Sequence, residues 1–259
     1  RGFVSAPGNA ALTVNGVGTH LDDYGRFQAN AVPLTPGSNT VTAVVTTQDG
    51  QTTSQSIAIN STGRGTFVVR ASPTEGLNSL QVTFTVENPG NVPFKQINFD
   101  LDNDGFPNVI ATPNQFTDGT LTVTATYPVG TWLATIKVYD DQDRAIYSTS
   151  KSIVVLQPIL LQGNLLAIYD GMLSRLRAGN IPGALTAFTG AAYDKYNAIF
   201  TQLQPTLASI ADQLGEVREV NFGIDLAEFS VVRNTSEGPK RFMFYLIRAE
   251  DGIWRIDGM

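Results

Sequence analysis

The stretch LTVTATYPVGTWLATIKVYDDQDRAIYSTSKSIVV, residues 121–155, alternates apolar and polar side chains in three runs. This period of two predicts strands over 121–127, 132–139 and 148–155. Tyr-Pro-Val-Gly separates the first two runs, and an acidic turn separates the last two. Pro, Gly and Asp are typical turn residues, and β-branched residues suit a half-buried sheet, so the stretch predicts an antiparallel β-sandwich.

The strand-like pattern, rich in β-branched residues, extends over the first 157 residues, which hold 23 of the 28 threonines. Further strands are predicted over 67–71, 80–87 and 94–101. Residues 10–60 carry short alternating runs with turns at Asn15-Gly16 and Asp49-Gly50, a pattern typical of hairpins. Residues 61–65, Ser-Thr-Gly-Arg-Gly, predict a linker between two all-β modules, residues 1–63 and 64–157.

After Gln157-Pro158 the apolar period changes to that of a helix. Leu161, Leu165 and Tyr169 belong to a stripe that predicts a helix over 160–178. A short helix is expected from Ile181-Pro182, and a third helical stripe is expected to break at Pro205. Strands are then predicted over 220–233, 240–249 and 253–257. Residues 158–259 therefore predict an α+β domain with helices packed on a curved antiparallel sheet.

Composition excludes several kinds of chemistry. The 259 residues carry a net charge of −6, no Cys and a single His, His20. A thiolate nucleophile and a Cys/His zinc site are excluded, and a Ser-His-Asp triad is possible only around His20, which we expect to be an exposed surface group. The acidic balance disfavours nucleic acid as a partner, and no apolar run is long enough to span a membrane. We expect a protein that is not an enzyme.

The sharpest motif lies at residues 100–108, DLDNDGFPN. Alternate Asp side chains on a tight loop are typical of calcium ligation, since Ca²⁺ takes six to eight oxygens. The predicted ligands are Asp100, Asp102, Asp104, the carbonyl of Phe106, and Asn108. Ala111 stands where an EF-hand has its bidentate Glu, and the alternative interpretation is a solvated turn. Asp140, Asp141 and Asp143 form a second acidic turn that either lends a ligand or ends a strand.

The α+β domain carries aromatic residues that two interpretations accommodate. One is a small-molecule pocket between the helices and the concave sheet face, with Asp170 or Asp225 as a polar contact. The other is a packed core, because aromatic residues at helical spacing are usually buried together. The candidate pocket residues are Tyr169, Tyr193, Tyr196, Phe229, Phe244 and Trp254.

Three segments resemble known families. Residues 12–59, LTVNGVGTHLDDYGRFQANAVPLTPGSNTVTAVVTTQDGQTTSQSIAI, resemble a bacterial immunoglobulin-like module of the glucodextranase B-domain type. INFDLDNDGFPN at 97–108, followed by the strands at 123–155, resembles a polycystic-kidney-disease-type (PKD) immunoglobulin-like domain. LRAGNIPGALTAF at 176–188 and EDGIWRIDGM at 250–259 resemble the nuclear transport factor 2-like (NTF2-like, cystatin-like) α+β cone.

These resemblances imply two immunoglobulin-like β-sandwiches followed by an α+β cone. They further imply a non-enzymatic bacterial surface or secreted protein, located extracellularly, at the cell surface or in the periplasm. Its modules would act as spacer or adhesion units, with a protein or glycan at the cell surface as partner and calcium as the one cofactor. Two alternatives remain open: small-molecule or peptide binding in the cone, and an accessory carbohydrate-binding region of a larger polysaccharide-processing enzyme.

Overall fold

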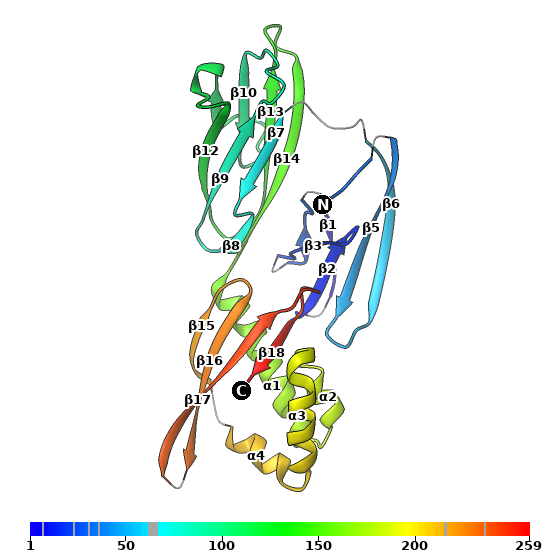
Figure 1. The fold of residues 1–259 in the computed structure, drawn as a ribbon, viewed down its shortest axis with the longest axis vertical. Helices are drawn as coiled ribbons and strands as arrows, with labels where there is room; N and C mark the ends of the chain where they lie inside the picture. Colours follow the sequence, from blue (N-terminus) through cyan, green and yellow to red (C-terminus); the bar gives the residue numbers. More distant parts are fainter. Residues whose placement is uncertain are drawn as a thin grey trace. The chain divides into compact units, whose positions relative to one another are not determined.

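The computed structural model describes residues 1–6, 8–22, 24–30, 32–35, 37–61, 67–214, 217–235 and 237–259 (Figure 1). The chain forms two compact units, and each is built from three chain segments. Unit 1 comprises Arg1–Val4, Thr13–Val44 and Ser54–Gln157, and unit 2 comprises Ser5–Leu12, Val45–Thr53 and Pro158–Met259. The predicted 1–63 module thus contributes residues to both units, and its predicted linker lies mostly outside the described residues. The division into domains 1–63, 64–157 and 158–259 stays a prediction from the sequence.

Antiparallel strands dominate unit 1. A five-stranded sheet has the order β11-β10-β13-β14-β8, and a three-stranded sheet has the order β12-β9-β7. The strands of these two sheets are β7 (Val68–Ser72), β8 (Glu75–Leu77), β9 (Leu80–Glu87), β10 (Gln96–Asp100), β11 (Val109–Ala111), β12 (Thr120–Tyr127), β13 (Gly130–Tyr139) and β14 (Ala145–Leu156). A short 3₁₀ helix, η1 (Pro113–Gln115), follows β11.

The remaining strands come from the first 61 residues. β1 (Gly2–Phe3) pairs with β4 (Arg26–Phe27) in a two-stranded ribbon. A four-stranded sheet of order β3-β2-β5-β6 contributes residues to both units. Its strands are β2 (Ala10–Val14), β3 (Val17–Thr19), β5 (Gly37–Thr47) and β6 (Thr52–Ser61).

The core of unit 1 lies between its five-stranded and three-stranded sheets. Alternate residues of β9 and β10 are buried, and Phe84 and Phe99 are fully enclosed. Phe99 faces Ile136 across β10 and β13, and Phe84 faces Val123 across β9 and β12. This burial of one face of each strand explains the period of two in the sequence. The strands predicted over 80–87, 121–127 and 132–139 are confirmed by β9, β12 and β13.

Side chains of residues 20–30 hydrogen-bond to the sheet strands of unit 1. The Asn30 side chain donates to the Ser152 carbonyl and accepts from the Ser152 N–H, both at 2.8 Å. The Thr131 hydroxyl donates to Asp22 Oδ2 at 2.9 Å. His20 forms an ion pair with Glu75, and its side chain is only 12% exposed. The prediction of an exposed histidine is therefore wrong, because the His20 side chain lies against the half-buried carboxylate of Glu75 in β8.

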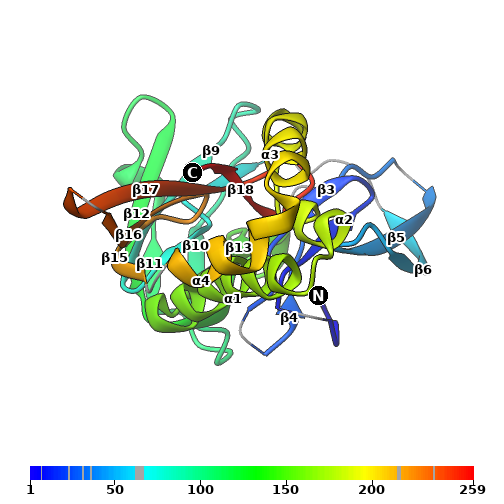
Figure 2. The ribbon, with the colours of Figure 1, turned by 90° about the horizontal axis from the view of Figure 1, so that it is seen from below.

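Unit 2 combines four α-helices with a four-stranded antiparallel sheet of order β15-β16-β17-β18. Helix α1 packs on α2 and α4, and α2 packs on α3 (Figure 2). The elements are α1 (Pro158–Arg177), α2 (Ile181–Leu185), α3 (Gly190–Gln202), η2 (Gln204–Thr206), α4 (Leu207–Gln213), β15 (Val217–Phe222), β16 (Leu226–Thr235), β17 (Gly238–Arg248) and β18 (Trp254–Gly258). No helix in the described part of the chain combines the length and apolarity needed to cross a bilayer.

The helix boundaries follow local chemistry. Gly179, at a φ of +70°, ends α1, and the Asn180 side chain accepts from the Gly183 N–H to cap α2. The predicted break at Pro205 is confirmed, since η2 separates α3 from α4. The single strand predicted over 220–233 is wrong. Residues 223–225 reverse the chain between β15 and β16, and the Gly223 N–H donates to the Leu226 carbonyl at 2.8 Å.

An ion pair fixes the turn between β17 and β18. Arg255 donates from both terminal nitrogens to the two oxygens of Asp251, each at 2.8 Å. These hydrogen bonds, together with one from the Ile253 N–H, hold the pKa of the Asp251 carboxyl below its usual value of 3.8. A lowered pKa stabilises the folded state at pH values above 3.8, and this contribution disappears as the pH falls through the folded-state pKa.

The Phe99→Ala substitution is expected to lower the free energy of unfolding of unit 1 by about 3–5 kcal/mol, because it leaves a cavity in the sandwich core. Phe106 lies seven residues further along the chain, and its side chain is 73% exposed, so Phe106→Ala is the matched control, with an expected change within about 0.5 kcal/mol. Urea unfolding in EDTA, followed by tryptophan fluorescence, measures both. Equal losses in the two variants would contradict the assigned core.

A double-mutant cycle tests the Asp251–Arg255 pair. Asp251→Asn, Arg255→Gln and the double variant are expected to give a favourable coupling at pH 7 that shrinks well below pH 3.8, where the carboxyl is protonated. Chemical unfolding at the two pH values measures this coupling. A coupling of the same size at both would show that the ionised carboxylate does not stabilise the turn.

Candidate functional site: an acidic loop and a polar cleft

The acidic loop connects β10 to β11 in unit 1. Because the two strands pair with each other, Phe99 against Val109, the loop closes on itself, and the Asn108 N–H donates to the Phe99 carbonyl at 2.8 Å. Asn103 and Gly105 have φ values of +61° and +93°, which let the chain turn tightly. The turn carries three acidic side chains at alternate positions.

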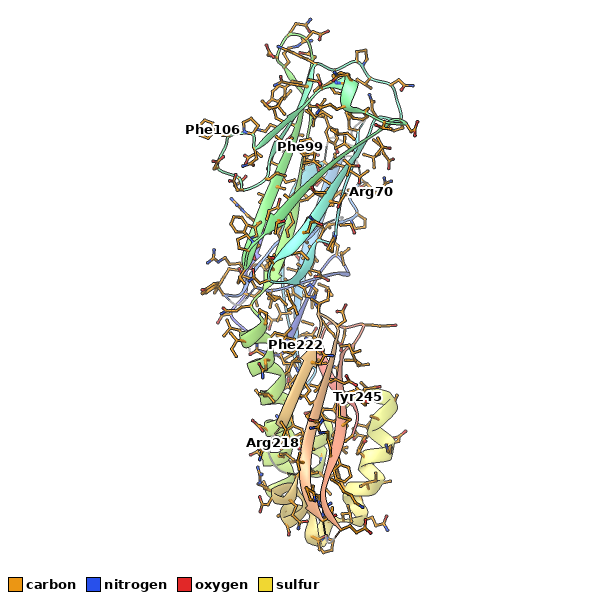
Figure 3. The ribbon with its side chains drawn as sticks, turned by 90° about the vertical axis from the view of Figure 1, so that its left-hand side faces the viewer. Arg70, Phe99, Phe106, Arg218, Phe222 and Tyr245 are labelled. Atoms are coloured by element: carbon orange, nitrogen blue, oxygen red, sulfur yellow. The ribbon has the colours of Figure 1, made fainter. Side chains whose placement is uncertain are left out.

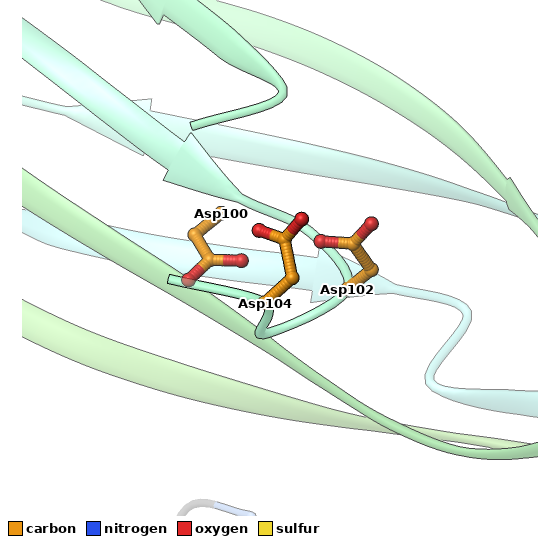
Figure 4. A group of neighbouring side chains, drawn as sticks. All are labelled: Asp100, Asp102 and Asp104. Carbon is orange, nitrogen blue, oxygen red and sulfur yellow. The ribbon is translucent and has the colours of Figure 1, made fainter. Parts of the chain in front are cut away.

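Asp100, Asp102 and Asp104 come together at this loop (Figure 4). Each offers a carboxylate oxygen, and the three oxygens lie within 4.8 Å of one another. The backbone holds two of the carboxylates, since the Gly105 N–H donates to Asp100 Oδ2 at 3.1 Å and the Phe106 N–H donates to Asp104 Oδ1 at 2.8 Å. Three like charges at this separation repel one another, and a bound cation would remove that repulsion.

Asp100 has one oxygen without a partner. Its Oδ1 atom is buried and accepts no hydrogen bond from the described residues. A buried carboxylate oxygen is costly unless a donor or a metal satisfies it. An all-oxygen donor set suits a hard cation such as Ca²⁺. The residues present therefore fit calcium.

The other two predicted ligands have different surroundings. Asn108 Oδ1 accepts from the Leu101 N–H, and its Nδ2 donates to Asp102 Oδ2 at 3.3 Å. The Asn108 side chain thereby links the end of the loop to its start. The Phe106 side chain projects away from the loop, whereas Phe99 lies among the strands (Figure 3). Below the loop, the Tyr127 hydroxyl donates to the Leu101 carbonyl at 3.1 Å. Burial, and secondarily the Asp102 carboxylate, raises the pKa of Tyr127.

The second acidic turn serves strand termination. Asp140 Oδ1 accepts from the backbone N–H groups of Gln142 and Arg144, at 3.0 and 2.9 Å. Hydrogen bonds from Arg144 hold the Asp140 pKa below its usual value. Asp143 accepts from Lys95 at 2.7 Å. These carboxylates have protein partners, and the turn lies outside the Asp100–Asp102–Asp104 cluster.

The six candidate pocket residues of unit 2 occupy different surroundings. Tyr169, Phe229 and Phe244 are buried in one stack, with ring centroids 4.5 Å apart for Tyr169 and Phe244 and 5.0 Å for Phe229 and Phe244. Burial raises the pKa of Tyr169 to about 12. These three rings pack on one another between α1 and the sheet.

The other three candidates lie elsewhere in unit 2. Tyr196 stacks on Phe188 at 4.6 Å, and its hydroxyl donates to the Met259 carbonyl at 2.8 Å. Tyr193 is 41% exposed on α3. Trp254 is partly buried at the start of β18, where its backbone contacts Asn9. The structure thus brings three of the six residues into one cluster.

Asn9 joins residues of unit 2 that are far apart in the sequence. Its Nδ2 donates to the Trp254 carbonyl, and its Oδ1 accepts from the Trp254 N–H, both at 3.0 Å. The same Nδ2 donates to Gln48 Oε1 at 3.2 Å, and Gln48 Nε2 donates to the Thr186 carbonyl at 3.4 Å. The two amide side chains thus link the 5–12 segment, the β5–β6 turn, α2 and β18.

A cleft of about 580 Å³ opens beside this junction, and we call it the polar cleft. No sequence pattern marks this cleft, because its walls come from three separate segments, none of which carries a motif. It is lined by Gly8, Asn9, Thr47, Gln48, Asp49, Gln51, Asn164, Ala167, Ile168, Arg175 and Thr186.

Comparisons with known proteins assign no family to the chain. No protein-family model and no curated protein matches it. A solved structure described as fibronectin(III)-like modules of Clostridium thermocellum CbhA aligns at 16% identity, over 61% of this chain and 84% of that chain, with a TM-score of 0.26. A TM-score this low carries no functional argument.

Replacing Asn9 tests the junction. Asn9→Ala removes the partners of both Trp254 backbone groups and is expected to destabilise unit 2 by about 1–3 kcal/mol. Asn197→Ala is the control, because Asn197 is exposed on α3, where alanine is a good helix former. Hydrogen exchange at residues 254–256 reports the loss. Unchanged protection there in Asn9→Ala would contradict the junction.

Proposed function

We propose that this chain is a non-catalytic, exported bacterial protein in which β-modules act as spacer or adhesion units and the acidic loop binds calcium. The observation that carries the proposal is the buried, unpartnered Oδ1 of Asp100 beside the carboxylates of Asp102 and Asp104. A calcium ion there would satisfy this oxygen and screen the three charges.

Calcium would also stiffen the loop that joins β10 to β11. An ion that binds only the folded state stabilises it by mass action. Modules outside the cell meet calcium at high concentration, and their sites have dissociation constants of about 10⁻⁴–10⁻³ M. An extracellular, cell-surface or periplasmic location follows as part of the proposal, with a surface protein or glycan as partner.

The finer family assignments belong to the proposal as well. We assign residues 64–157 to a PKD-like sandwich and residues 158–259 to an NTF2-like domain, whereas the immunoglobulin-like assignment of residues 1–63 stays a prediction from sequence, because this segment contributes residues to both units. The two packed sheets around Phe84 and Phe99 support the PKD-like assignment, and the helices beside a four-stranded antiparallel sheet support the NTF2-like assignment.

A non-catalytic role agrees with the side chains that the chain offers. It has no cysteine, and His20, its one histidine, is paired with Glu75 inside unit 1. Of the two alternative functions, ligand binding inside the cone draws no support from Tyr169, Phe229 and Phe244, because these three rings are buried against one another. Carbohydrate binding draws support from the polar cleft.

Calcium addition to the chelator-treated full-length protein is expected to show one site with a dissociation constant of about 10⁻⁴–10⁻³ M by isothermal titration calorimetry. At free calcium about a hundredfold above that constant, the unfolding free energy of unit 1 should rise by about 2.7 kcal/mol. Asp100→Asn is expected to abolish both effects.

Asp118→Asn is the matched control, because Asp118 lies exposed in another unit 1 turn with a φ of +50°, a conformation that asparagine tolerates. Wild-type protein that shows neither binding heat nor stabilisation would overturn the calcium site. A sub-micromolar dissociation constant would contradict the extracellular part of the proposal, because that range belongs to cytosolic sites.

A further inference from the structure

The polar cleft of unit 2 combines one anion, one cation and neutral polar side chains with a larger apolar surface. Asp49 lies in the β5–β6 turn and Arg175 lies near the end of α1. Hydrogen bonds from the Thr47 hydroxyl and the Gln51 N–H hold the pKa of Asp49 below its usual value, and the charge of Arg175 acts in the same direction. The cleft therefore combines a carboxylate and a guanidinium, whose opposite charges cancel.

Some side chains that line the cleft already have hydrogen-bond partners in the protein, and others have donors or acceptors free for a ligand. The side-chain amides of Asn9 and Gln48 hydrogen-bond to each other and to the Trp254 and Thr186 carbonyls. In the described residues, by contrast, no hydrogen bond involves the side-chain amides of Gln51 and Asn164, and Asp49 uses only Oδ1. Arg175 uses one terminal nitrogen, which donates to the Thr186 hydroxyl at 3.3 Å. The cleft thus presents two complete amides, a free carboxylate oxygen and most of a guanidinium.

These groups select a class of ligand. A planar carboxylate presents two acceptors side by side, a guanidinium presents two donors, and an amide presents one of each. The distance between these paired groups matches the distance between neighbouring hydroxyl groups of a ligand. A hydroxyl both donates and accepts, so a ring of hydroxyls satisfies such a mixed lining without carrying charge. Ile168 and Ala167 offer an apolar surface for the C–H groups of a sugar ring. The volume of about 580 Å³ is typical of small-molecule sites.

We infer that the polar cleft binds a neutral saccharide, with Asp49, Gln51, Asn164 and Arg175 as the hydrogen-bonding residues. A zwitterion such as a peptide would also engage Asp49 and Arg175, but it would leave the amide donors and the apolar surface unused. The inference does not rest on the proposed calcium site, since every cleft residue belongs to unit 2 and the acidic loop belongs to unit 1.

Gly8 gives the cleft a defined wall. A Cβ atom at this position would lie 3.1 Å from Asn164 Oδ1, so the Asn164 amide rests against the backbone of the 5–12 segment. The junction at Asn9, one residue further on, holds that segment in place. A side chain at residue 8 would press on the Asn164 amide, so glycine at this position keeps room for that amide in the wall of the cleft.

The test is an NMR titration of ¹⁵N-labelled full-length protein in EDTA with glucose, maltose, cellobiose and N-acetylglucosamine. At least one saccharide is expected to shift the side-chain amide signals of Gln51 and Asn164 saturably. Gln51→Ala and Arg175→Gln should each weaken that binding about tenfold. Arg177→Gln should leave it unchanged, because Arg177 pairs with Asp212 and is not part of the cleft lining.

The outcomes separate the two proposals. Binding in EDTA supports the inference whatever the calcium titration gives. Shifts that are confined to residues outside the cleft, or an absence of shifts with all four saccharides, overturn it. Shifts with glycylglycine in place of a saccharide also overturn it and would identify the site as one for zwitterions.

Discussion

The side-chain amide of Asn9 holds unit 2 together where three chain segments meet. It bonds to both backbone groups of Trp254, as a neighbouring strand would, and it also reaches Gln48 in the β5–β6 turn. Buried backbone groups need partners, so this one side chain determines where the 5–12 segment lies against β18. The same contact positions Gly8 and the 47–51 turn, which form walls of the polar cleft. The C-terminal elements and two segments from the first 53 residues therefore form one compact unit.

The two candidate sites bring their polar groups together in different ways. In unit 1 a single short loop concentrates three carboxylates and leaves one buried oxygen unsatisfied, so charge and desolvation both favour a cation. In unit 2 the cleft has balanced charge, and its free groups are two amides, a carboxylate oxygen and a guanidinium from separate segments. The first arrangement fits the proposed hard metal ion, whereas the second fits the proposed uncharged ligand with several hydroxyl groups. Both depend on backbone that is fixed by pairing, through β10 and β11 in one case and through Asn9 in the other.

Local pattern predicted most of the secondary structure. The period of two over 80–87 and the helical stripe from Leu161 to Leu176 correspond to β9 and α1, because each has one face buried. The convergence of Asp100, Asp102 and Asp104 was also predictable, since these side chains lie within five residues of one another in the sequence. Periodicity alone predicted one continuous strand over 220–233, but the turn from Gly223 to Asp225 divides it into β15 and β16. The partner of His20 and the walls of the cleft were not predictable, because Glu75, Asn164 and Arg175 lie far from their neighbours in sequence and no local pattern encodes such contacts.

Segments 5–12 and 45–53 fold as part of unit 2, and native-state hydrogen exchange of the full-length protein measures this directly. Peptides that cover residues 8–12 and 45–53 should lose protection with increasing denaturant together with peptides from 158–259. They should do so independently of peptides from 67–157. Exchange of the two segments in step with residues 67–157, while 158–259 stays protected, would contradict the assignment and remove the physical basis of the polar cleft.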